Sequence, residues 1–219
     1  MTAVDKKGKL IAIAGNIGSG KTSLAKLVEK YFKWNVFYEL PDDNPYIFDF
    51  YKDMQRWAFH LQIFFLQQRF NHIMKIMNQP GISVIDRTIY EDAYVFAKTL
   101  YEKGLMDPRD YTTYTQLFKA MIELIPYPDV VVYLKASVPT LVDQIYKRGR
   151  PYERFIDIDY LGSLNDNYEQ WIKDFMKNQK TKVIIVDMDR TNFVDNEEHR
   201  SQVLERIRTA VQGLFDKVV

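Results

Sequence analysis

The chain has 219 residues, enough for one sizeable α/β domain with a large core. Hydrophobic residues make up 47% of it, which excludes a disordered chain, and the formal net charge of +1 offers no broad basic field for nucleic acid or an anionic membrane. The absence of cysteine excludes a disulfide framework and a thiolate zinc site. His60, His72 and His199 lack the spacing of metal ligands, so we expect ordinary core or surface roles for them.

The polar residues 1–9 contain no signal-peptide core, and no apolar run is long enough to span a bilayer. We therefore expect a cytoplasmic protein that makes no membrane contact. We also expect residues 1–9 to be disordered and residues 10–219 to form one domain, because no repeat or linker-like stretch divides them.

The chain begins with an apolar run over residues 10–14, a glycine-rich turn, and a helix expected from about residue 20 to 33. The turn matches G-x-x-x-x-G-K-[ST], whose glycines allow successive backbone N–H groups to point at phosphate oxygens. Lys21 is expected to reach the β- and γ-phosphates, and the Thr22 hydroxyl is expected to bind Mg²⁺. The alternative is a chance glycine-rich turn, which the flanking strand and helix make the weaker interpretation. The predicted phosphate-loop residues are Gly15, Asn16, Ile17, Gly18, Ser19, Gly20, Lys21 and Thr22.

Strands and helices alternate along the rest of the chain. A short strand over 35–38 ends at Glu39, and strands are expected over 82–85, 129–134 and 183–186. The predicted helices cover about 56–78, a segment opened by a Thr88–Glu91 capping box, one that starts at Asp107, one from Ser137 to Gly149, and the stretches 158–178 and 196–216. This order predicts an α/β fold of three layers, with a parallel five-stranded sheet and helices on both faces.

Three polar features fall at the carboxyl ends of predicted strands: the glycine turn, Glu39 and Asp86. Ligands on open parallel sheets bind beyond those ends, so we expect one active site there. Asp86 is predicted to help Thr22 hold Mg²⁺, and its alternative role is that of an acid at a helix entry.

Arg148 and Arg150 flank Gly149 between two predicted helices. We interpret this segment as a mobile lid that brings positive charge to a transferred phosphoryl group. The alternative is a solvated helix end, where basic residues suit the helix dipole.

Gln62 and Arg69 lie seven residues apart on the long helix and therefore face the same way. The neighbouring apolar residues imply burial almost all round, so we expect this pair to face a cavity, the alternative being a polar stripe on an exposed helix. Glutamine can bind a nucleobase edge through two hydrogen bonds, and Asp92 is a candidate partner for Arg69.

These motifs in this order resemble the deoxyribonucleoside kinase family, and most closely the short bacterial deoxyadenosine, deoxyguanosine and deoxycytidine kinases. The resemblance runs from Leu10 to the last helix and rests on the phosphate loop, Glu39 with 44–46, Gln62 with Arg69, residues 86–88 and residues 148–150. It implies a P-loop kinase-like fold with a short arginine lid, ATP as phosphoryl donor, Mg²⁺, and a homodimer. The expected reaction is phosphorylation of a deoxyribonucleoside 5′-hydroxyl.

The resemblance also implies roles for individual residues. Glu39 is expected to be the general base, Arg87 to orient the base and the acceptor, and Lys21, Arg148 and Arg150 to assist the transfer. Asn192 and Phe193 match the segment near the ATP adenine. The expected substrate-binding residues are Glu39, Tyr51, Gln62, Arg69, Arg87, Asp92, Phe96 and Glu153, with Phe96 stacking on the nucleobase and with Tyr51 and Glu153 near the sugar 3′-hydroxyl. The alternatives are Tyr51 and Phe96 as core aromatics, Glu153 as a surface acid, and Glu39 as an exposed carboxylate at a strand end.

Three positions depart from the family pattern: Gln144 replaces a usual basic lid residue, Leu40 precedes Pro41, and Asn44 stands where many animal members have tryptophan. Members with an arginine and aspartate pair like Arg69 and Asp92 tend to prefer purines or cytosine, which favours deoxyadenosine here. A nucleoside monophosphate kinase and a nucleotide-gated switch protein are the alternative functions.

Overall fold

The computed structural model describes residues 8–177 and 181–215 and contains a five-stranded sheet in which every pairing is parallel. The strand order is β2-β3-β1-β4-β5. The strands are β1 (Lys9–Gly15), β2 (Asn35–Phe37), β3 (Ile82–Asp86), β4 (Val130–Lys135) and β5 (Lys182–Asp187). The predicted parallel sheet of five strands is therefore confirmed.

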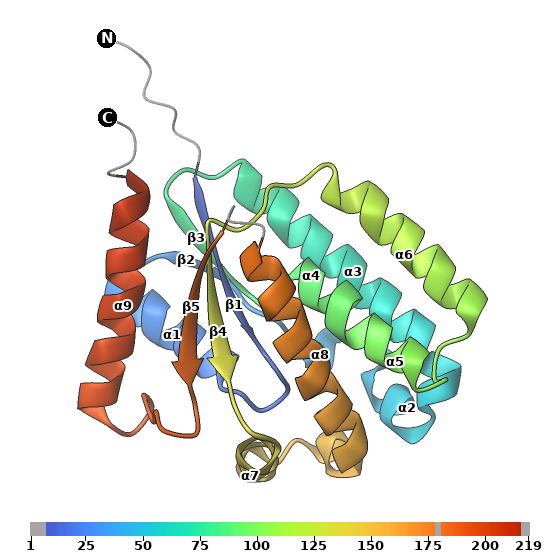
Figure 1. Ribbon diagram of the computed structural model, residues 1–219. Helices are drawn as coiled ribbons and strands as arrows, with labels where there is room; N and C mark the ends of the chain where they lie inside the picture. Colours follow the sequence, from blue (N-terminus) through green and yellow to red (C-terminus); the bar gives the residue numbers. More distant parts are fainter. Residues whose placement is uncertain (1–7, 178–180, 216–219) are drawn as a thin grey trace.

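Helices cover both faces of the sheet, as the alternation predicted (Figure 1). On one face α1 (Lys21–Phe32) and α9 (Glu197–Phe215) pack against side chains such as Ile11 and Ile13. The opposite face presents Ala12 and Ala14 of β1, whose small side chains leave room for the larger helical layer. The helical segments on or beyond that second face are α2 (Ile47–Lys52), α3 (Met54–Met77), α4 (Ile89–Glu91), α5 (Lys98–Glu102), α6 (Pro108–Ile122) and α8 (Ile158–Lys177).

The helix predicted to open at Thr88 is confirmed, together with both hydrogen bonds of its capping box. It continues through the π-helical turn η2 (Asp92–Ala97) into α5, a widening that the sequence did not predict. Such π-helical turns often occur at functional sites because they redirect side chains. Here the turn carries Asp92 and Phe96.

Two short helical turns and one helix complete the part of the fold that surrounds the site. They are the 3₁₀ turns η1 (Pro41–Asp43) and η3 (Pro151–Phe155), and α7 (Val138–Arg148). Gly149 ends α7 in the left-handed conformation, with φ of 69°, as expected for a glycine after a helix.

Some element ends differ from the sequence prediction. Lys9 already belongs to β1 and its side chain pairs with Asp129, so the expected disorder does not extend to residue 9, while residues 1–7 lie outside the described part of the chain. Ser137 precedes α7 as predicted, but its hydroxyl lies within hydrogen-bond distance of the Asp189 and Thr140 side chains and does not cap the helix backbone. Within the described residues, no helix has both the length and the apolar character that crossing a membrane requires.

Candidate active site

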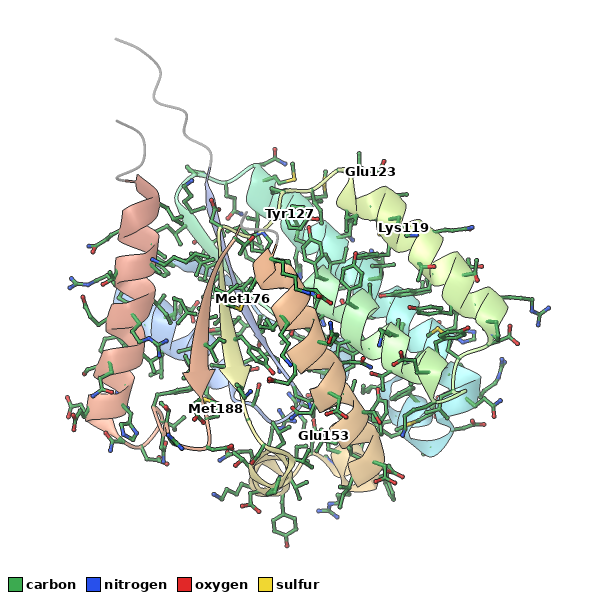
Figure 2. The ribbon with its side chains drawn as sticks, in the orientation of Figure 1. Lys119, Glu123, Tyr127, Glu153, Met176 and Met188 are labelled. Carbon is green, nitrogen blue, oxygen red and sulfur yellow. The ribbon has the colours of Figure 1, made fainter. Side chains whose placement is uncertain are left out.

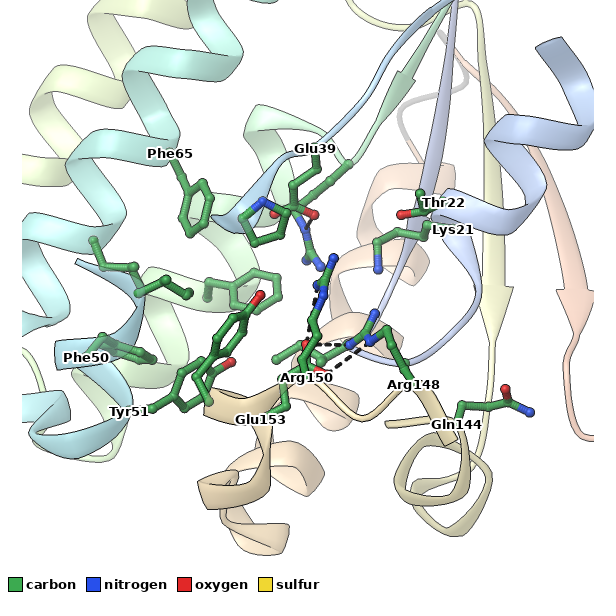
Figure 3. Close-up of a pocket in the computed structure, with 18 of the residues that line it drawn as sticks. Lys21, Thr22, Glu39, Phe50, Tyr51, Phe65, Gln144, Arg148, Arg150 and Glu153 are labelled. Atoms are coloured by element: carbon green, nitrogen blue, oxygen red, sulfur yellow. Dashed lines mark hydrogen bonds and ion pairs between the residues drawn. The ribbon is translucent and has the colours of Figure 1, made fainter. Parts of the chain in front are cut away.

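A cavity of about 580 Å³ lies at the carboxyl ends of β1, β2 and β3, where the sequence predicted a single site. Figure 3 shows Lys21 and Thr22 on one side of it and Phe50, Tyr51 and Phe65 on the other. Most of the predicted site residues line this cavity; they are Ile17, Gly18, Gly20, Lys21, Thr22, Glu39, Tyr51, Gln62, Arg69, Arg87, Asp92, Phe96, Arg148, Arg150 and Glu153. Residues separated by more than a hundred positions in the sequence are thus brought to one place.

The phosphate loop has the backbone conformation that its glycines permit. Gly18 and Gly20 have φ of 84° and 94°, and a Cβ on Gly18 would lie 2.8 Å from the Leu141 carbonyl oxygen. Lys21 is buried, and its Nζ donates to the Asn16 carbonyl at 2.9 Å. Burial, followed by the charge of Arg87, lowers the pKa of Lys21 to about 7, so an anionic phosphate at this position would favour the charged form.

Thr22 and Asp86, the predicted magnesium ligands, lie together. The Thr22 hydroxyl donates to Asp86 Oδ2 at 2.7 Å, while Asp86 Oδ1 is buried and accepts no hydrogen bond from any described residue. Burial and the nearby charge of Glu39 raise the pKa of Asp86, and a cation at this point would relieve that penalty. A hydroxyl, a carboxylate and the phosphates of a bound nucleotide form a donor set that suits Mg²⁺, so these residues fit the ion.

Glu39 lies between two buried arginines. Its Oε2 accepts from Arg87 Nε at 2.9 Å and its Oε1 from Arg69 Nη2 at 2.8 Å. Burial alone would raise the pKa of Glu39, but Arg87, Arg69 and Lys21 outweigh it and hold that pKa well below its usual range. The carboxylate is therefore charged and faces the same cavity as the phosphate loop.

Arg69 also forms the predicted ion pair with Asp92, through its Nε. Both side chains are at most 2% exposed. Burial raises the pKa of Asp92 to about 6, while Arg69 and Arg87 act in the opposite direction. The contact between Arg69 and Glu39 was not predicted. It means that Arg69 contacts both Asp92, its predicted partner, and Glu39, the predicted general base.

The far end of the cavity suits a flat, partly polar ring. Gln62 is 2% exposed, and its Oε1 accepts no hydrogen bond within the described structure. Gln62 and Arg69 are both buried and both line the cavity, which confirms that the pair faces a cavity and not bulk solvent. The other residues that line this end are mostly aromatic or aliphatic: Ile47, Phe50, Leu61, Phe65, Phe96 and Tyr160.

In the lid, both arginines are held by Glu153. Glu153 is 5% exposed and accepts from Arg148 Nε at 3.0 Å and from Arg150 Nη1 at 3.4 Å. Figure 2 places Glu153 between α7 and the start of α8. The alternative interpretation of Glu153 as a surface acid is therefore wrong. Arg148, Arg150 and Glu153 line the cavity together, and the one carboxylate offsets part of the positive charge of the two arginines. Gln144, at the departure from the family pattern, lines the cavity from α7.

Asn192 and Phe193 do not line the cavity. Phe193 is 1% exposed and packs in the core, with its ring tip 3.5 Å from where a Cβ on Gly20 would sit. The Asn192 amide donates to Asp195. Phe193 thus packs next to Gly20 of the phosphate loop, and the expected contact with an adenine ring stays a prediction.

Two buried residues behind the site were not predicted to take part in it. Glu91 was assigned only to the capping box, and Tyr168 was not singled out, yet both lie in hydrogen-bond contact with site residues. Sequence offers only a weak signal for them, since a buried carboxylate and a helical tyrosine occur in many cores.

Comparison with known proteins gives one consistent family. Residues 11–212 match the family profile described as deoxynucleoside kinase. The chain is 37% identical over 207 residues to the deoxyadenosine/deoxycytidine kinase of Bacillus subtilis (strain 168), covering 94% of each protein. It is 38% identical over 192 residues to the deoxyadenosine kinase of Dictyostelium discoideum, covering 88% of this chain and 76% of that protein. A solved structure of deoxyadenosine kinase from M. mycoides, with the products dCMP and a flexible dCDP bound, has a TM-score of 0.81 and 30% identity and covers 91% of this chain and 99% of that one.

Proposed function

Because the chain belongs to the deoxynucleoside kinase family, we propose that it transfers the γ-phosphoryl group of ATP to the 5′-hydroxyl of a deoxyribonucleoside, with deoxyadenosine preferred. The observation that carries the proposal is the position of Glu39. This ionised carboxylate shares one cavity with the phosphate loop and is held by two arginines that reach it from different elements.

In the proposed reaction the nucleoside 5′-oxygen attacks the γ-phosphorus, the bond from that phosphorus to the β,γ-bridging oxygen breaks, and Glu39 takes the hydroxyl proton. The products are ADP and the nucleoside 5′-monophosphate. Lys21 would bind the β- and γ-phosphate oxygens, and Thr22 and Asp86 would hold Mg²⁺, which when bound neutralises phosphate charge. Arg148 and Arg150 would stabilise charge on the transferring group.

The far end of the cavity, where Gln62 lies, suits an uncharged nucleoside better than a charged substrate. Gln62 supplies an amide for a base edge, and Phe96 and Phe65 supply apolar faces beside it. Arg69 lies beside this end of the cavity. Its side chain would crowd the thymine methyl group and would favour a nucleobase that offers a hydrogen-bond acceptor such as purine N7. Two of the most similar relatives are kinases of deoxyadenosine, one of which also takes deoxycytidine, and this agrees with the proposed preference.

A panel of the four common deoxynucleosides and their ribose analogues, with ATP and Mg²⁺, tests the proposal. We expect the highest kcat/KM with deoxyadenosine, with deoxyguanosine and deoxycytidine next and thymidine last. Formation of ADP and of the 5′-monophosphate should be followed together, because hydrolysis of ATP without an acceptor would instead indicate the nucleotide-gated switch.

A nucleoside monophosphate kinase is the second enzyme that the phosphate loop permits. Its acceptor carries a phosphate, which Glu39 at this position would repel. Deoxyadenosine and dAMP should therefore be compared as acceptors. Faster turnover of dAMP would overturn the proposed function.

We expect the double variant Arg69→Met with Asp92→Ala to shift preference toward thymidine. The change removes the arginine that would crowd the thymine methyl group and leaves no buried carboxylate unpaired. Because Arg69 also holds Glu39, kcat should fall for every substrate, so the measurement is the ratio of kcat/KM for thymidine to that for deoxyadenosine. We expect that ratio to rise by about tenfold or more.

The matched control for this variant is Arg56→Met, an exposed arginine at the start of the same helix, α3. It should leave the ratio unchanged. An unchanged ratio in the double variant as well would mean that Arg69 and Asp92 do not select the base.

The homodimer that the resemblance implies remains a prediction, as does the cytoplasmic location expected from the sequence. The described surface has large apolar side chains on the helical layer farthest from α9, including Tyr94, Leu117 and Leu124. They are compatible with contact between two copies of the chain.

A further inference from the structure

Arg87 is held in place by residues that lie outside the cavity. Its Nη1 donates to the Tyr168 hydroxyl at 2.8 Å, and that hydroxyl donates to Glu91 Oε1 at 2.9 Å. The N–H of Gly15, the first residue of the phosphate loop, donates to the same Oε1 at 3.1 Å. A continuous chain of hydrogen bonds therefore connects Arg87 to the phosphate loop through Tyr168 and Glu91.

From these contacts we propose that Glu91 and Tyr168 are positioning residues of the kinase reaction. They fix the guanidinium of Arg87 relative to the phosphate loop. The part of the site that would bind ATP and the part that would bind the nucleoside then keep a constant relative position. The inference rests on the proposed function, in which Arg87 would hold Glu39 next to the nucleoside.

Arg87 needs more than its contact with Glu39 to hold its orientation. Its backbone is in the left-handed region, with φ of 74°, which non-glycine residues rarely adopt. Its guanidinium lies over the Phe96 ring, 4.3 Å from the centroid, and donates through Nε to Glu39. A single hydrogen bond at Nε leaves the plane of the guanidinium free to tilt, and the bond to Tyr168 at Nη1 removes that freedom. This second anchor remains when Glu39 turns its oxygen to the substrate hydroxyl.

The two carboxylate oxygens of Glu91 have different hydrogen-bond partners, one in the helix cap and the other at the site. Oε2 accepts the Thr88 N–H at 2.7 Å and completes the capping box. Oε1 plays no part in the cap and is occupied by Gly15 and Tyr168. A capping box needs only one carboxylate oxygen, so the contacts of Oε1 are additional to it.

The burial of Glu91 supports this division. The residue is 0% exposed, Tyr168 is 0% exposed, and no described lysine or arginine forms an ion pair with Glu91. A buried carboxylate is costly unless hydrogen bonds satisfy it, and here its donors are two backbone N–H groups and one hydroxyl. The hydroxyl that satisfies Glu91 is also the acceptor for Arg87, so the carboxylate and the guanidinium polarise the same Tyr168 group.

Tyr168→Phe isolates this contact, because it removes the hydroxyl and keeps the ring. We expect kcat to fall by about tenfold to a hundredfold, the range for loss of one hydrogen bond to a charged group, with the KM for ATP within about twofold of the wild type. Glu91→Gln should lower kcat and also raise the KM for ATP, because it disturbs Gly15 directly.

Tyr133→Phe is the matched control. Tyr133 is 2% exposed, and its ring stacks on that of Tyr168 with centroids 6.0 Å apart, but its hydroxyl donates to Glu169 instead. We expect this variant to keep the wild-type kcat. If the two tyrosine variants lost equal activity, or if Tyr168→Phe kept the wild-type kcat, the inference would be overturned while the kinase activity of the wild type stood.

A measurement independent of activity is the exchange of the Arg87 guanidinium protons with solvent, followed by NMR. The Arg87 signals are assigned by their loss in Arg87→Lys. We expect exchange to be about tenfold or more faster in Tyr168→Phe than in the wild type and unchanged in Tyr133→Phe. Equal exchange in Tyr168→Phe and the wild type would show that Tyr168 does not anchor Arg87, whichever substrate the enzyme uses.

Discussion

Replacing Glu39 by glutamine is expected to lower kcat by about 10²- to 10⁴-fold, the contribution of a general base. Glutamine has nearly the same shape as glutamate and can still accept a hydrogen bond from Arg87 or Arg69, but it cannot take the proton of the 5′-hydroxyl. The measurement is kcat with ATP and deoxyadenosine, together with the Kd for deoxyadenosine. We expect the Kd to change far less than kcat, because the base edge and the sugar are held by other residues.

The suitability of Glu39 as a base needs an explanation, because its pKa is held well below the usual range. A carboxylate with a low pKa is a weak proton acceptor at neutral pH. In a loose transition state of phosphoryl transfer, however, the attacking oxygen loses its proton late, when the new bond has already made that proton acidic. The low pKa then keeps Glu39 charged throughout the working range of pH, and no acid limb of the kcat profile should appear near the usual value of 4.5.

The same shift has a consequence for stability. A carboxyl group whose pKa is lower in the folded protein stabilises the fold above its unfolded pKa and loses that contribution as the pH falls through the folded value. Glu39→Gln should therefore be less stable than the wild type at pH 7 and should lose less stability on acidification. Urea unfolding at pH 7 and at lower pH measures both effects.

Glu102→Gln is the control for Glu39→Gln, since Glu102 pairs with Lys98 on α5 and does not line the cavity. It should retain wild-type kcat. If Glu39→Gln kept a kcat within about twofold of the wild type while remaining folded, the assignment of the base would be wrong.

The parts of the site that the sequence predicted are those with local patterns. The phosphate loop is a contiguous motif, and Asp86 lies at the end of an apolar strand, so parallel pairing of β1 with β3 brings Thr22 and Asp86 together. Gln62 and Arg69 share a helix face, which follows from helical periodicity alone. In each case the inference needed only one element or two adjacent strands.

The parts that the sequence did not predict depend on contacts between distant elements. The bond from Arg69 to Glu39 joins α3 to the loop after β2, and the chain from Arg87 through Tyr168 to Glu91 needs α8 to pack beside α4. No spacing rule links such residues, because their separation in space is set by how the layers pack. The π-helical turn was missed for a related reason: Asp92–Ala97 has ordinary helical composition, and the widening appears only in the backbone hydrogen bonds.

The segment with Arg148, Arg150 and Glu153 provides a further example of contacts that only the structure reveals. From the sequence, Arg148 and Arg150 were expected to meet a phosphoryl group and Glu153 to meet a sugar hydroxyl. The structure pairs them with one another, which suggests an exchange of partners during the reaction. When a triphosphate enters, Arg148 would leave Glu153 for the phosphate oxygens, and Glu153 would become free to accept a hydrogen bond from the sugar.

Replacing Arg148 by glutamine is therefore expected to lower kcat by about a thousandfold, the lower part of the range for an arginine that stabilises charge in phosphoryl transfer. Only 35% of its side chain is exposed in the present position, and it reaches Glu153 through both Nε and Nη2, so it is already at the cavity. The KM for ATP should rise less than kcat falls, because Lys21 and the loop backbone still bind the phosphates. Steady-state kinetics with deoxyadenosine measure both quantities.

Arg148→Lys separates the charge of the side chain from its geometry. Lysine carries the charge but cannot form the paired hydrogen bonds of a guanidinium, so it should recover only part of the loss. Arg154→Gln is the matched control, because Arg154 is exposed in the same lid segment and does not line the cavity. It should retain wild-type kcat. Equal losses in Arg148→Gln and Arg154→Gln would show that the lid contributes only general positive charge, and an undiminished kcat in Arg148→Gln would remove Arg148 from the mechanism.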